Sequence, residues 1–536
     1  MREFDLAVIG GGLAGCTLAL HVLKLRPETN IIVVDKRSFP LSEGVGTVGE
    51  STVEIASHYL ADVLGLKEHL EQAQLPKLGL RYFLESDNNL AIENRLEVGG
   101  NKFAPTPSYQ IDRSRLENFL QQELLRLGAS FIEQSRVKEA EIDKQGHTLR
   151  IYSDKGEQSF VKAKWLVDAS GRTSVLKKKL GLQKDFDHDC SSAWWRMDGE
   201  FKVDEWCKEP CWGQNNQGQH ARWFSTNHLM GKGYWVWIIP LASGHTSFGI
   251  VTDSNIHPFN TYNTFERALS WLEQHEPQLA ALCKKHAETL KDFAGIKNYS
   301  YSCKQVFSPD RWALTGEAGL FVDPFYSPGS DFIAFSNTYI ADLITRELSG
   351  EAISMRCEIY NELYLRFAEA TIKVYKNQYS ILGNPLVTPL KVYWDWCFYW
   401  HFMGRIFFRG KLCDLRFASK YRSTFERLHT LSSSMQNLFN RWNELERPKS
   451  KAGFLDLGRH PFLSELNRSL RNFDAPAEEL FEKGVSELEG IAVELVRLFE
   501  SRTGEKFDLE IELTAFKDRE VVVPFFEDMR SFLDAA

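Results

Sequence analysis

The stretch that decides the fold is Phe4-Asp5-Leu6-Ala7-Val8-Ile9-Gly10-Gly11-Gly12-Leu13-Ala14-Gly15. An apolar run meets a cluster of glycines there, and leucines at helical spacing follow as far as residue 25. Residues 31–34 are all β-branched, which is typical of a parallel strand buried on both faces. The pattern predicts a βαβ unit that carries the G-x-G-x-x-G fingerprint in the turn between its first strand and its helix.

This fingerprint gives each of its three glycines a separate role. Gly10 makes the tight turn, Gly12 lets the backbone approach a pyrophosphate, and Gly15 allows the helix to pack closely on the strand. Asp35 ends the second strand, where its carboxylate can accept the hydroxyls of a ribose. The contacts to a dinucleotide that we expect in this region are Gly10, Gly12, Leu13, Ala14, Gly15, Asp35 and Lys36.

Composition limits the class of protein and of partner. A chain of 536 residues predicts two or three folded units, and 43% hydrophobic with 25% charged residues is a globular balance. The net charge of −8 shows no basic excess, so nucleic acid is not expected as a partner. The nine cysteines have no repeated spacing and predict neither a disulfide framework nor a metal site. Without an apolar leader or a stretch of about 20 apolar residues, we expect no transmembrane segment and a cytoplasmic protein.

The rest of the chain divides by its pattern. Residues 113–127 have apolar side chains at helical spacing. Strand-like runs, which predict an antiparallel layer over a substrate pocket, occur at 148–152, 158–167, 196–203 and 234–251. Long helical stretches begin near residue 335. The aromatic-rich residues 393–403 predict a helix packed over that layer, and the alternatives are a wall of an aromatic substrate pocket or insertion into a lipid surface. Residues 507–525 alternate enough to contain strands.

Two later segments resemble the second and third FAD motifs of the flavin monooxygenase superfamily, which includes para-hydroxybenzoate hydroxylase. They are residues 166–172, which read LVDASGR, and residues 315–324, which read TGEAGLFVDP. The resemblance spans residues 4–345 and implies FAD, with Asp168 and Glu317 among its contacts. The third motif usually reads Gly-Asp, so Glu317 carries its carboxylate one methylene further out. For Asp168, a strand-end turn held by a local ion pair is the alternative.

The same resemblance implies an α/β fold. It consists of a Rossmann-like FAD-binding domain, an inserted antiparallel β-sheet layer that covers the substrate, and a mostly helical C-terminal region. We expect the FAD-binding domain to comprise residues 1–185 and 300–345, the β layer residues 186–299, and the helical region residues 346–536.

Three further segments resemble the flavin-dependent halogenases, in the branch that acts on phenols and pyrroles. Residues 235–240 read W-x-W-x-I-P, residues 48–51 include Gly-Glu-Ser, and residues 77–79 read Lys-Leu-Gly. Taken alone, two tryptophans on one face of an apolar strand are most often core. The resemblance adds Glu50, Ser51, Arg113, Pro324 and Gly329 to the expected cofactor contacts.

In that family, reduced FAD, oxygen and halide give hypohalous acid, which travels to a lysine beside the substrate. Lys77 matches this lysine. An ammonium can hydrogen-bond hypohalous acid, and a neutral amine can be halogenated by it. The alternative is a solvated lysine that follows Pro76 on a loop.

Residues 323–330 depart from the halogenase pattern at two positions. Tyr326 stands where members specific for tryptophan carry a glutamate, which disfavours that substrate and leaves phenols or pyrroles, free or carried on a protein arm. Pro328 has no N–H at a place where backbone N–H groups hold the halide in the family. Gly329 and Ser330 can still donate, but the proline leaves the halide in doubt as a partner.

Two rival functions stay open on this pattern. One is an FAD-dependent aromatic hydroxylase, which Pro328 favours, and the other is a flavin-binding protein that has lost catalysis and serves a partner. The chain shows one dinucleotide fingerprint, so we expect a separate reductase to supply reduced flavin.

Overall fold

The computed structural model describes residues 2–44, 46–208, 212 and 222–511. The chain forms two compact units, and each is built from three stretches of sequence. Unit 1 comprises Met1–Gln74, Ile111–His188 and Tyr299–Ile372, whereas unit 2 comprises Leu75–Gln110, Asp189–Asn298 and Lys373–Ala536. The domain boundaries expected from the sequence stay a prediction. Of the strands expected within 507–525, residues 507–511 are irregular and the rest lie outside the described residues.

Unit 1 is organised around a mixed sheet. Its strands are β1 (Arg2–Ile9), β2 (Ile31–Val34), β7 (Ser130–Ile132), β8 (Ser135–Glu141), β9 (His147–Ser153), β10 (Gln158–Asp168) and β18 (Trp312–Leu314). The order is β7-β2-β1-β10-β9-β8, and β18 also pairs with β10. Strands β7, β2, β1, β10 and β18 are parallel, and β9 and β8 extend the sheet antiparallel. All four residues of β2 are buried, as the β-branched run predicts.

One expectation about this sheet is wrong. The runs at 148–152 and 158–167 do not belong to a separate antiparallel layer, because β10 pairs in parallel with β1 along most of its length. An apolar run predicts a strand but not the partner of that strand, which depends on contacts distant in sequence.

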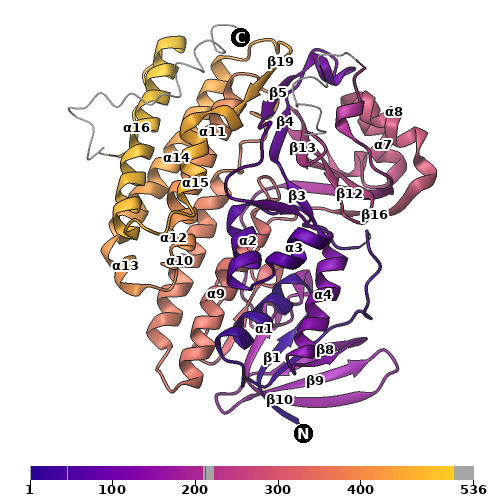
Figure 1. Cartoon of the computed structure of the whole chain (residues 1–536), viewed down its shortest axis with the longest axis vertical. Helices are drawn as coiled ribbons and strands as arrows, with labels where there is room; N and C mark the ends of the chain where they lie inside the picture. The colour runs from indigo at the N-terminus through magenta and orange to yellow at the C-terminus, as the bar shows by residue number, and fades with distance from the viewer. Residues whose placement is uncertain (1, 45, 209–211, 213–221, 512–536) are drawn as a thin grey trace. The chain divides into compact units, whose positions relative to one another are not determined.

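Helices pack around the sheet of unit 1. They are α1 (Leu13–Leu25), α2 (Glu54–His58), α3 (Lys67–Ala73), α4 (Arg113–Arg126), α5 (Val175–Lys179), α9 (Gly329–Leu348) and α10 (Ser354–Lys373). The carboxylate of Asp112 caps α4 by accepting the N–H of Arg115. Helix α1 contacts both α4 and α9 and is buried along most of its length (Figure 1). A two-stranded pair, β11 (Gln183–Lys184) with β17 (Ser302–Cys303), completes the unit.

Unit 2 contains an eight-stranded sheet of order β16-β12-β15-β14-β13-β4-β5-β19. The strands are β4 (Gly79–Phe83), β5 (Leu96–Gly99), β12 (Cys190–Asp198), β13 (Ser225–Gly231), β14 (Tyr234–Pro240), β15 (His245–Asp253), β16 (Leu290–Ile296) and β19 (Gly453–Asp456). Of the run expected at 196–203, only residues 196–198 belong to a strand, the end of β12, whereas the run at 234–251 is a hairpin. A second pair, β3 (Leu75–Lys77) with β6 (Ser108–Gln110), is antiparallel.

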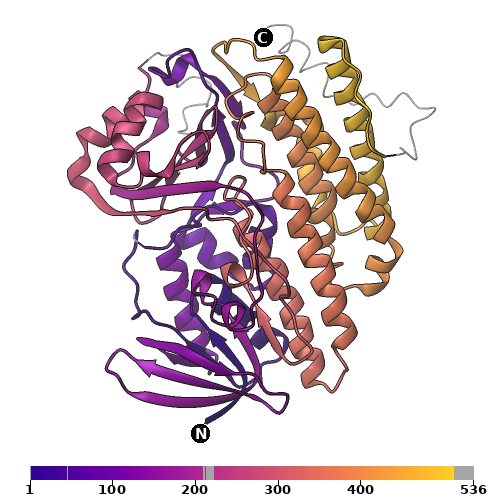
Figure 2. The same ribbon diagram turned by 180° about the vertical axis from the view of Figure 1, so that it is seen from behind.

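One face of this sheet packs on two helices of the same unit, α7 (Phe265–His275) and α8 (Pro277–Lys285). Trp195, Phe248, Trp271 and Leu279 are buried in the core between them. Figure 2 shows both helices from the side opposite to Figure 1. The other face carries the rings of Trp235 and Trp237.

The helical region of unit 2 consists of α11 (Val387–Tyr399), α12 (Arg405–Phe408), α13 (Leu415–Lys420), α14 (Arg422–Leu445), α15 (Pro461–Ser469) and α16 (Ala477–Thr503). A π-helical turn at Trp400–Gly404 joins α11 to α12, so the aromatic-rich segment is helical as predicted. Helix α14 lies against both α11 and α16 (Figures 1 and 2). The predicted α/β fold with a helical C-terminal region is confirmed. None of the described helices is long and apolar enough to cross a bilayer.

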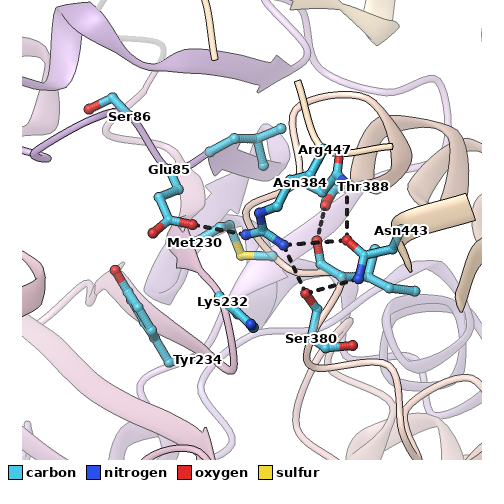
Figure 3. Close-up of polar contacts among 12 residues, drawn as sticks. Glu85, Ser86, Met230, Lys232, Tyr234, Ser380, Asn384, Thr388, Asn443 and Arg447 are labelled. Carbon is cyan, nitrogen blue, oxygen red and sulfur yellow. Dashed lines mark hydrogen bonds and ion pairs between the residues drawn. The ribbon is translucent and has the colours of Figure 1, made fainter. Parts of the chain in front are cut away.

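Polar contacts fasten this helical region to the sheet of unit 2, as Figure 3 shows. Arg447, just after α14, pairs with Glu85 at 3.0 Å and donates to the carbonyl oxygen of Ser380 at 3.1 Å. The buried amide of Asn384 donates to Asn443 at 2.9 Å, and β19 pairs with β5. The helices after residue 386 and the sheet are thus parts of one packed body.

A buried ion pair holds α7 and α8 to the same sheet. The guanidinium of Arg95 donates to both carboxylate oxygens of Glu276, at 2.5 and 3.2 Å, and both side chains are buried. The hydroxyl of Tyr234 donates to Glu276 at 2.9 Å. Burial raises the pKa of Glu276, although Arg95 opposes that shift.

Replacing Glu276 by alanine leaves the Arg95 guanidinium buried without its carboxylate. We expect Glu276→Ala to lower the free energy of unfolding by about 3–5 kcal/mol in urea denaturation. Glu273 on α7 forms an exposed pair with Lys284 and provides the control. The Glu273→Ala change should cost less than about 1 kcal/mol. Equal effects of the two changes would contradict the assignment.

Candidate functional site

The glycines of the fingerprint lie where the sequence places them, between β1 and α1 in unit 1. Gly10 has φ +106°, and a Cβ there would collide with the carbonyl oxygen of Ala169. A Cβ on Gly15 would collide with the carbonyl oxygen of Gly10. By contrast, the protein atom nearest to a Cβ on Gly12 is 3.7 Å away, on Arg37. Gly10 and Gly15 are thus required by the fold, while Gly12 keeps a space open at the start of α1, which fits a bound pyrophosphate.

Asp35 is buried at the end of β2, beside this turn. Its Oδ2 accepts the N–H of Gly11 at 2.6 Å, and its two oxygens accept Arg37 Nε and Nη2 at 3.0 and 3.1 Å. Lys36, which the sequence analysis places among the cofactor contacts, is exposed to solvent, whereas Arg37 is partly buried. Burial opposes the charge of Arg37, but hydrogen bonding to Asp35 and the charges of Glu117 and Asp35 outweigh it and raise its pKa.

Glu117 on α4 is a site residue that sequence reasoning missed. Its carboxylate is fully buried and accepts the N–H of Leu13, the first residue of α1, at 3.2 Å. It also pairs with Arg37 at 2.7 Å and with Arg113 at 2.6 Å. The spacing of Arg113 and Glu117, four residues apart on one helix, is a pattern that could have predicted their pairing.

Arg113 connects α4 to the Gly-Glu-Ser segment. Its Nη1 donates to the carbonyl oxygen of Val48 at 2.6 Å, and a Cβ on Gly49 would lie 2.7 Å from that same nitrogen. The Nε of Arg113 is buried and has no hydrogen-bond partner among the residues that the structure describes. An orphaned cationic donor suits a phosphate oxygen. Glu50 and Ser51 are buried, and the carbonyl oxygen of Glu50 accepts the N–H of Ile111 at 2.6 Å.

Asp168 of the second motif is fully buried at the end of β10. Its oxygens accept the N–H groups of Ser170 at 2.9 Å and of Leu176 at 2.7 Å, and burial raises its pKa. The carboxylate thus shapes the turn between β10 and α5. This arrangement matches the strand-end turn weighed as an alternative, although its stabilising contacts are backbone hydrogen bonds; a cofactor contact stays a prediction.

Glu317 of the third motif forms an ion pair with Arg172 of the second, at 2.8 Å. Arg172 Nη1 also donates to the carbonyl oxygen of Tyr299 at 3.0 Å. Lys177 donates to the carbonyl oxygen of Gly319 at 2.9 Å, and burial lowers the pKa of Lys177 to about 8. The two motifs are therefore fastened to each other by side chains that follow Asp168 in the sequence.

Asp323 anchors the loop that carries Pro324 and Gly329. Its buried carboxylate lies 2.8 Å from His188 Nε2 and accepts the Tyr299 hydroxyl and the N–H of Phe325, both at 2.8 Å. Sequence reasoning missed His188 and Tyr299, because their contacts with Asp323 are distant in sequence.

The same loop contains backbone strain. Tyr326 and Ser327 have φ values of +68° and +61°, a region that non-glycine residues rarely adopt. Pro328 precedes α9, and Gly329 and Ser330 are the first residues of that helix. The first N–H groups of a helix have no intrahelical partner, so these two residues can donate to an anion even though Pro328 cannot.

Lys77 belongs to unit 2, where it is 2% exposed and pairs through β3 with Ser108 of β6. It is therefore not a solvated loop residue. His228 of the same unit is buried, and its Nδ1 lies 3.0 Å from the carbonyl oxygen of Arg81. Burial lowers the pKa of His228 to about 3, and the charge of Lys77 contributes to the shift.

The two tryptophans of W-x-W-x-I-P are buried on β14, and their indole N–H groups bond inside the protein. Trp235 Nε1 donates to the Tyr379 hydroxyl and Trp237 Nε1 to the Ser247 hydroxyl, each at 3.1 Å. A Cβ on Gly249 would collide with the Trp237 ring. Both tryptophan side chains are therefore buried and held by hydrogen bonds, as expected for core residues of such a strand.

Among the residues expected to contact the cofactor, all lie in unit 1, and the expected catalytic Lys77 lies in unit 2. The members in unit 1 are Gly10, Gly12, Leu13, Ala14, Gly15, Asp35, Lys36, Glu50, Ser51, Arg113, Asp168, Glu317, Pro324 and Gly329. Their individual roles stay predictions.

Comparison with known proteins identifies relatives of both units. Residues 3–253 match the family model described as an FAD binding domain. The chain is 26% identical over 428 residues to a flavin-dependent halogenase of Dictyostelium discoideum, covering 74% of this chain and 69% of that protein. It is 27% identical over 363 residues to the 1H-pyrrole-2-carbonyl-(peptidyl-carrier protein) chlorinase of Pseudomonas fluorescens, covering 63% of this chain and 75% of that protein.

The fold is also similar to that of a solved structure, halogenase PltM in complex with phloroglucinol and FAD. The TM-score is 0.62 at 16% identity, over 94% of this chain and 99% of that one. At 16% identity this match shows a similar fold and no more.

Substitutions in the glycine turn should distinguish Gly10, which the fold requires, from Gly12, which we expect to serve cofactor binding. Because the surroundings of Gly12 leave room for a methyl group, Gly12→Ala should fold with a loss of less than about 1 kcal/mol. It should bind FAD at least about 10-fold more weakly, measured by FAD fluorescence quenching. Gly10→Ala, with its positive φ, should lose more than about 1 kcal/mol of unfolding free energy. Full FAD affinity in folded Gly12→Ala would contradict the assignment.

The low pKa of His228 predicts acid sensitivity. In the unfolded state the imidazole of His228 has a pKa near 6.5. As the pH falls below that value, the unfolded state binds a proton, whereas the folded state keeps His228 neutral. Stability contributed by this group is complete above pH 6.5 and declines toward pH 3. Between pH 7 and pH 5, the wild type should lose about 2 kcal/mol more unfolding free energy than His228→Asn. Parallel stability curves would show that His228 is not buried in its neutral form.

Proposed function

Because this chain belongs to the flavin-dependent halogenase family, we propose that it uses reduced FAD, oxygen and a halide to halogenate an electron-rich aromatic ring. The observation that carries the proposal is the burial of Lys77 on a strand, since lysine is rarely buried so completely. The family match supplies the reaction class, and the residues below supply the chemistry.

FAD fits the turn at the start of α1. The fit rests on the space that Gly12 leaves open, on the orphaned Nε of Arg113, and on the carboxylate of Asp35 at the end of β2. We assign the diphosphate to the space at Gly12 and to Arg113, and the adenosine ribose to Asp35. Reduced FAD supplies the electrons with which oxygen oxidises halide to hypohalous acid.

Lys77 holds the hypohalous acid for transfer. Its ammonium donates a hydrogen bond to the oxygen of that acid, which polarises the oxygen–halogen bond. A ring carbon of the substrate attacks the halogen, so a carbon–halogen bond forms as the oxygen–halogen bond breaks. The displaced ring proton leaves with the oxygen as water. The buried position of Lys77 strengthens this hydrogen bond, because water competes for it less.

We place the halide at the start of α9, where Gly329 and Ser330 begin the helix. Their N–H groups belong to the N-terminal, positive end of the helix dipole, which favours an anion. Pro328 removes one donor from this site, so we expect a weak halide affinity, reached only at raised halide concentration.

The substrate is an electron-rich aromatic of phenol or pyrrole type. Tyr326 stands where tryptophan-specific relatives carry a glutamate, so the ring must lose its proton without that help. Similarity to a chlorinase that acts on pyrrole held by a peptidyl-carrier protein supports a tethered substrate for this chain as well. A separate flavin reductase completes the set of partners, because the chain carries one dinucleotide fingerprint.

A second function, aromatic hydroxylation, is favoured by one observation. Pro328 weakens the halide site that distinguishes halogenases from hydroxylases. Product formation that does not depend on halide would support it.

Lys77→Ala provides the test of the proposed function. It should leave FAD binding, flavin reduction and peroxide release unchanged and lower halogenated product by at least about 100-fold, because only the delivery step is removed. Product would be followed by mass spectrometry with a phenol and a carrier-tethered pyrrole, each with bromide and a flavin reductase. Exposed Lys232, in the same unit, provides the control, and Lys232→Ala should not change the rate. A halide-free hydroxylated product made equally well by Lys77→Ala would overturn the halogenase assignment.

A further inference from the structure

The guanidinium of Arg37 lies beside the space at Gly12. Arg37 Nη2 is the protein atom nearest to the position of a Cβ on Gly12, at 3.7 Å, and Glu117 Oε1 is next at 3.9 Å. This is the start of α1, where helix N–H groups attract phosphate. Arg37 therefore lines the space that the fingerprint keeps open, while its neighbour Lys36 is exposed to solvent.

We propose that Arg37 is a cofactor-binding residue for the diphosphate of FAD, and that Glu117 is the positioning residue that holds Arg37 in place. The proposal rests on FAD binding by this chain and not on the halogenation step. It replaces Lys36 with Arg37 as the cation that serves the adenylate half of the cofactor.

Three contacts fix the orientation of Arg37. Its Nε and Nη2 donate to Asp35, and its Nη1 donates to Glu117 Oε2 at 2.7 Å. Asp35 and Glu117 are both buried, at the end of β2 and on α4. An arginine held on two sides is ordered before the cofactor arrives, so binding does not have to order it.

The charges around Gly12 give the second argument. Glu117 accepts the N–H of Leu13, so a carboxylate already occupies one donor at the start of α1. A diphosphate brings further negative charge close to Glu117 and Asp35. Arg37 and Arg113 balance the two carboxylates, and without Arg37 the diphosphate would meet an excess of buried negative charge.

The alternative is that Arg37 only pairs with Asp35 and contributes to folding. The two roles differ in what happens to a ligand that carries phosphate. A purely structural Arg37 would affect adenosine and ADP alike, whereas a phosphate-binding Arg37 affects ADP more.

The experiment measures the dissociation constants of the full-length protein freed of flavin, for FAD by fluorescence quenching and for ADP and adenosine by competition with FAD. Arg37→Gln should weaken FAD and ADP by about 10- to 100-fold and adenosine by less than about 3-fold. Lys24→Gln, which removes an exposed charge in the last turn of α1, should leave all three within about 2-fold. The affinities of Glu117→Gln for FAD and ADP should lie between those of Arg37→Gln and those of the wild type, because Arg37 then loses one of the two carboxylates that hold it.

Circular dichroism and thermal unfolding establish that each variant is folded. If Arg37→Gln does not fold, Arg37→Lys decides the matter, because it keeps the charge but cannot bridge both carboxylates. It should weaken ADP by about 3- to 10-fold and leave adenosine unchanged. Wild-type affinity for ADP in either folded variant, or an equal loss for ADP and adenosine, would overturn the proposal. If the variants show the expected loss of ADP affinity but the wild type halogenates no substrate, the proposed function is refuted and this inference stands.

Discussion

The close approach of Gly15 to the carbonyl oxygen of Gly10 determines how α1 lies on β1, and the cofactor region of unit 1 is built on that contact. No side chain fits between the two backbones, so the helix begins directly above the strand. Its first N–H groups then lie beside the end of β2, where Asp35 accepts the N–H of Gly11. Glu117 on α4 accepts the N–H of Leu13, and α4 is thereby attached to the same point. The glycine turn thus lies beside a cluster of two carboxylates and two arginines, which are Asp35, Glu117, Arg37 and Arg113.

Charge compensation is the second organising rule of the protein. Buried ions are costly unless they are paired and hydrogen-bonded. In unit 1, Asp323 is surrounded by His188, Tyr299 and a backbone N–H group, and Arg172 joins the two later motifs through Glu317. In unit 2, Arg95 forms a buried ion pair with Glu276, which lies between α7 and α8. The contacts in unit 1 hold its loops at several points, and a strained pair such as Tyr326 and Ser327 persists only where the surrounding structure holds it in place.

The sequence predicts well what depends on neighbouring residues. The βαβ unit, the tight turn at Gly10, the close packing at Gly15, the helix at 113–127 and the helical aromatic segment all follow from local patterns, and the structure confirms them. It predicts poorly what depends on distant pairing. Residues 75–110 join unit 2 because β4 pairs with β13, and no pattern within that segment names its partner. For the same reason the sequence does not predict the contacts of Arg37, Glu117, His188 and Tyr299. The role of Lys77 stays a prediction from a family resemblance, and its pairing with β6 is again a contact distant in sequence.

The pairing of β19 with β5 has a consequence for how the chain is made. Leu96 pairs with Gly453, so the edge of β5 finds its partner only after residue 453 has left the ribosome. During synthesis that edge presents unpaired backbone groups, which are a template for aggregation. The 357 residues from Leu96 to Gly453 take roughly 20 to 70 s to synthesise at ordinary elongation rates of about 5–20 residues per second. One edge of β5 in unit 2 therefore stays unpaired until β19 is made, while the first two strands of unit 1, complete by residue 34, can pair early.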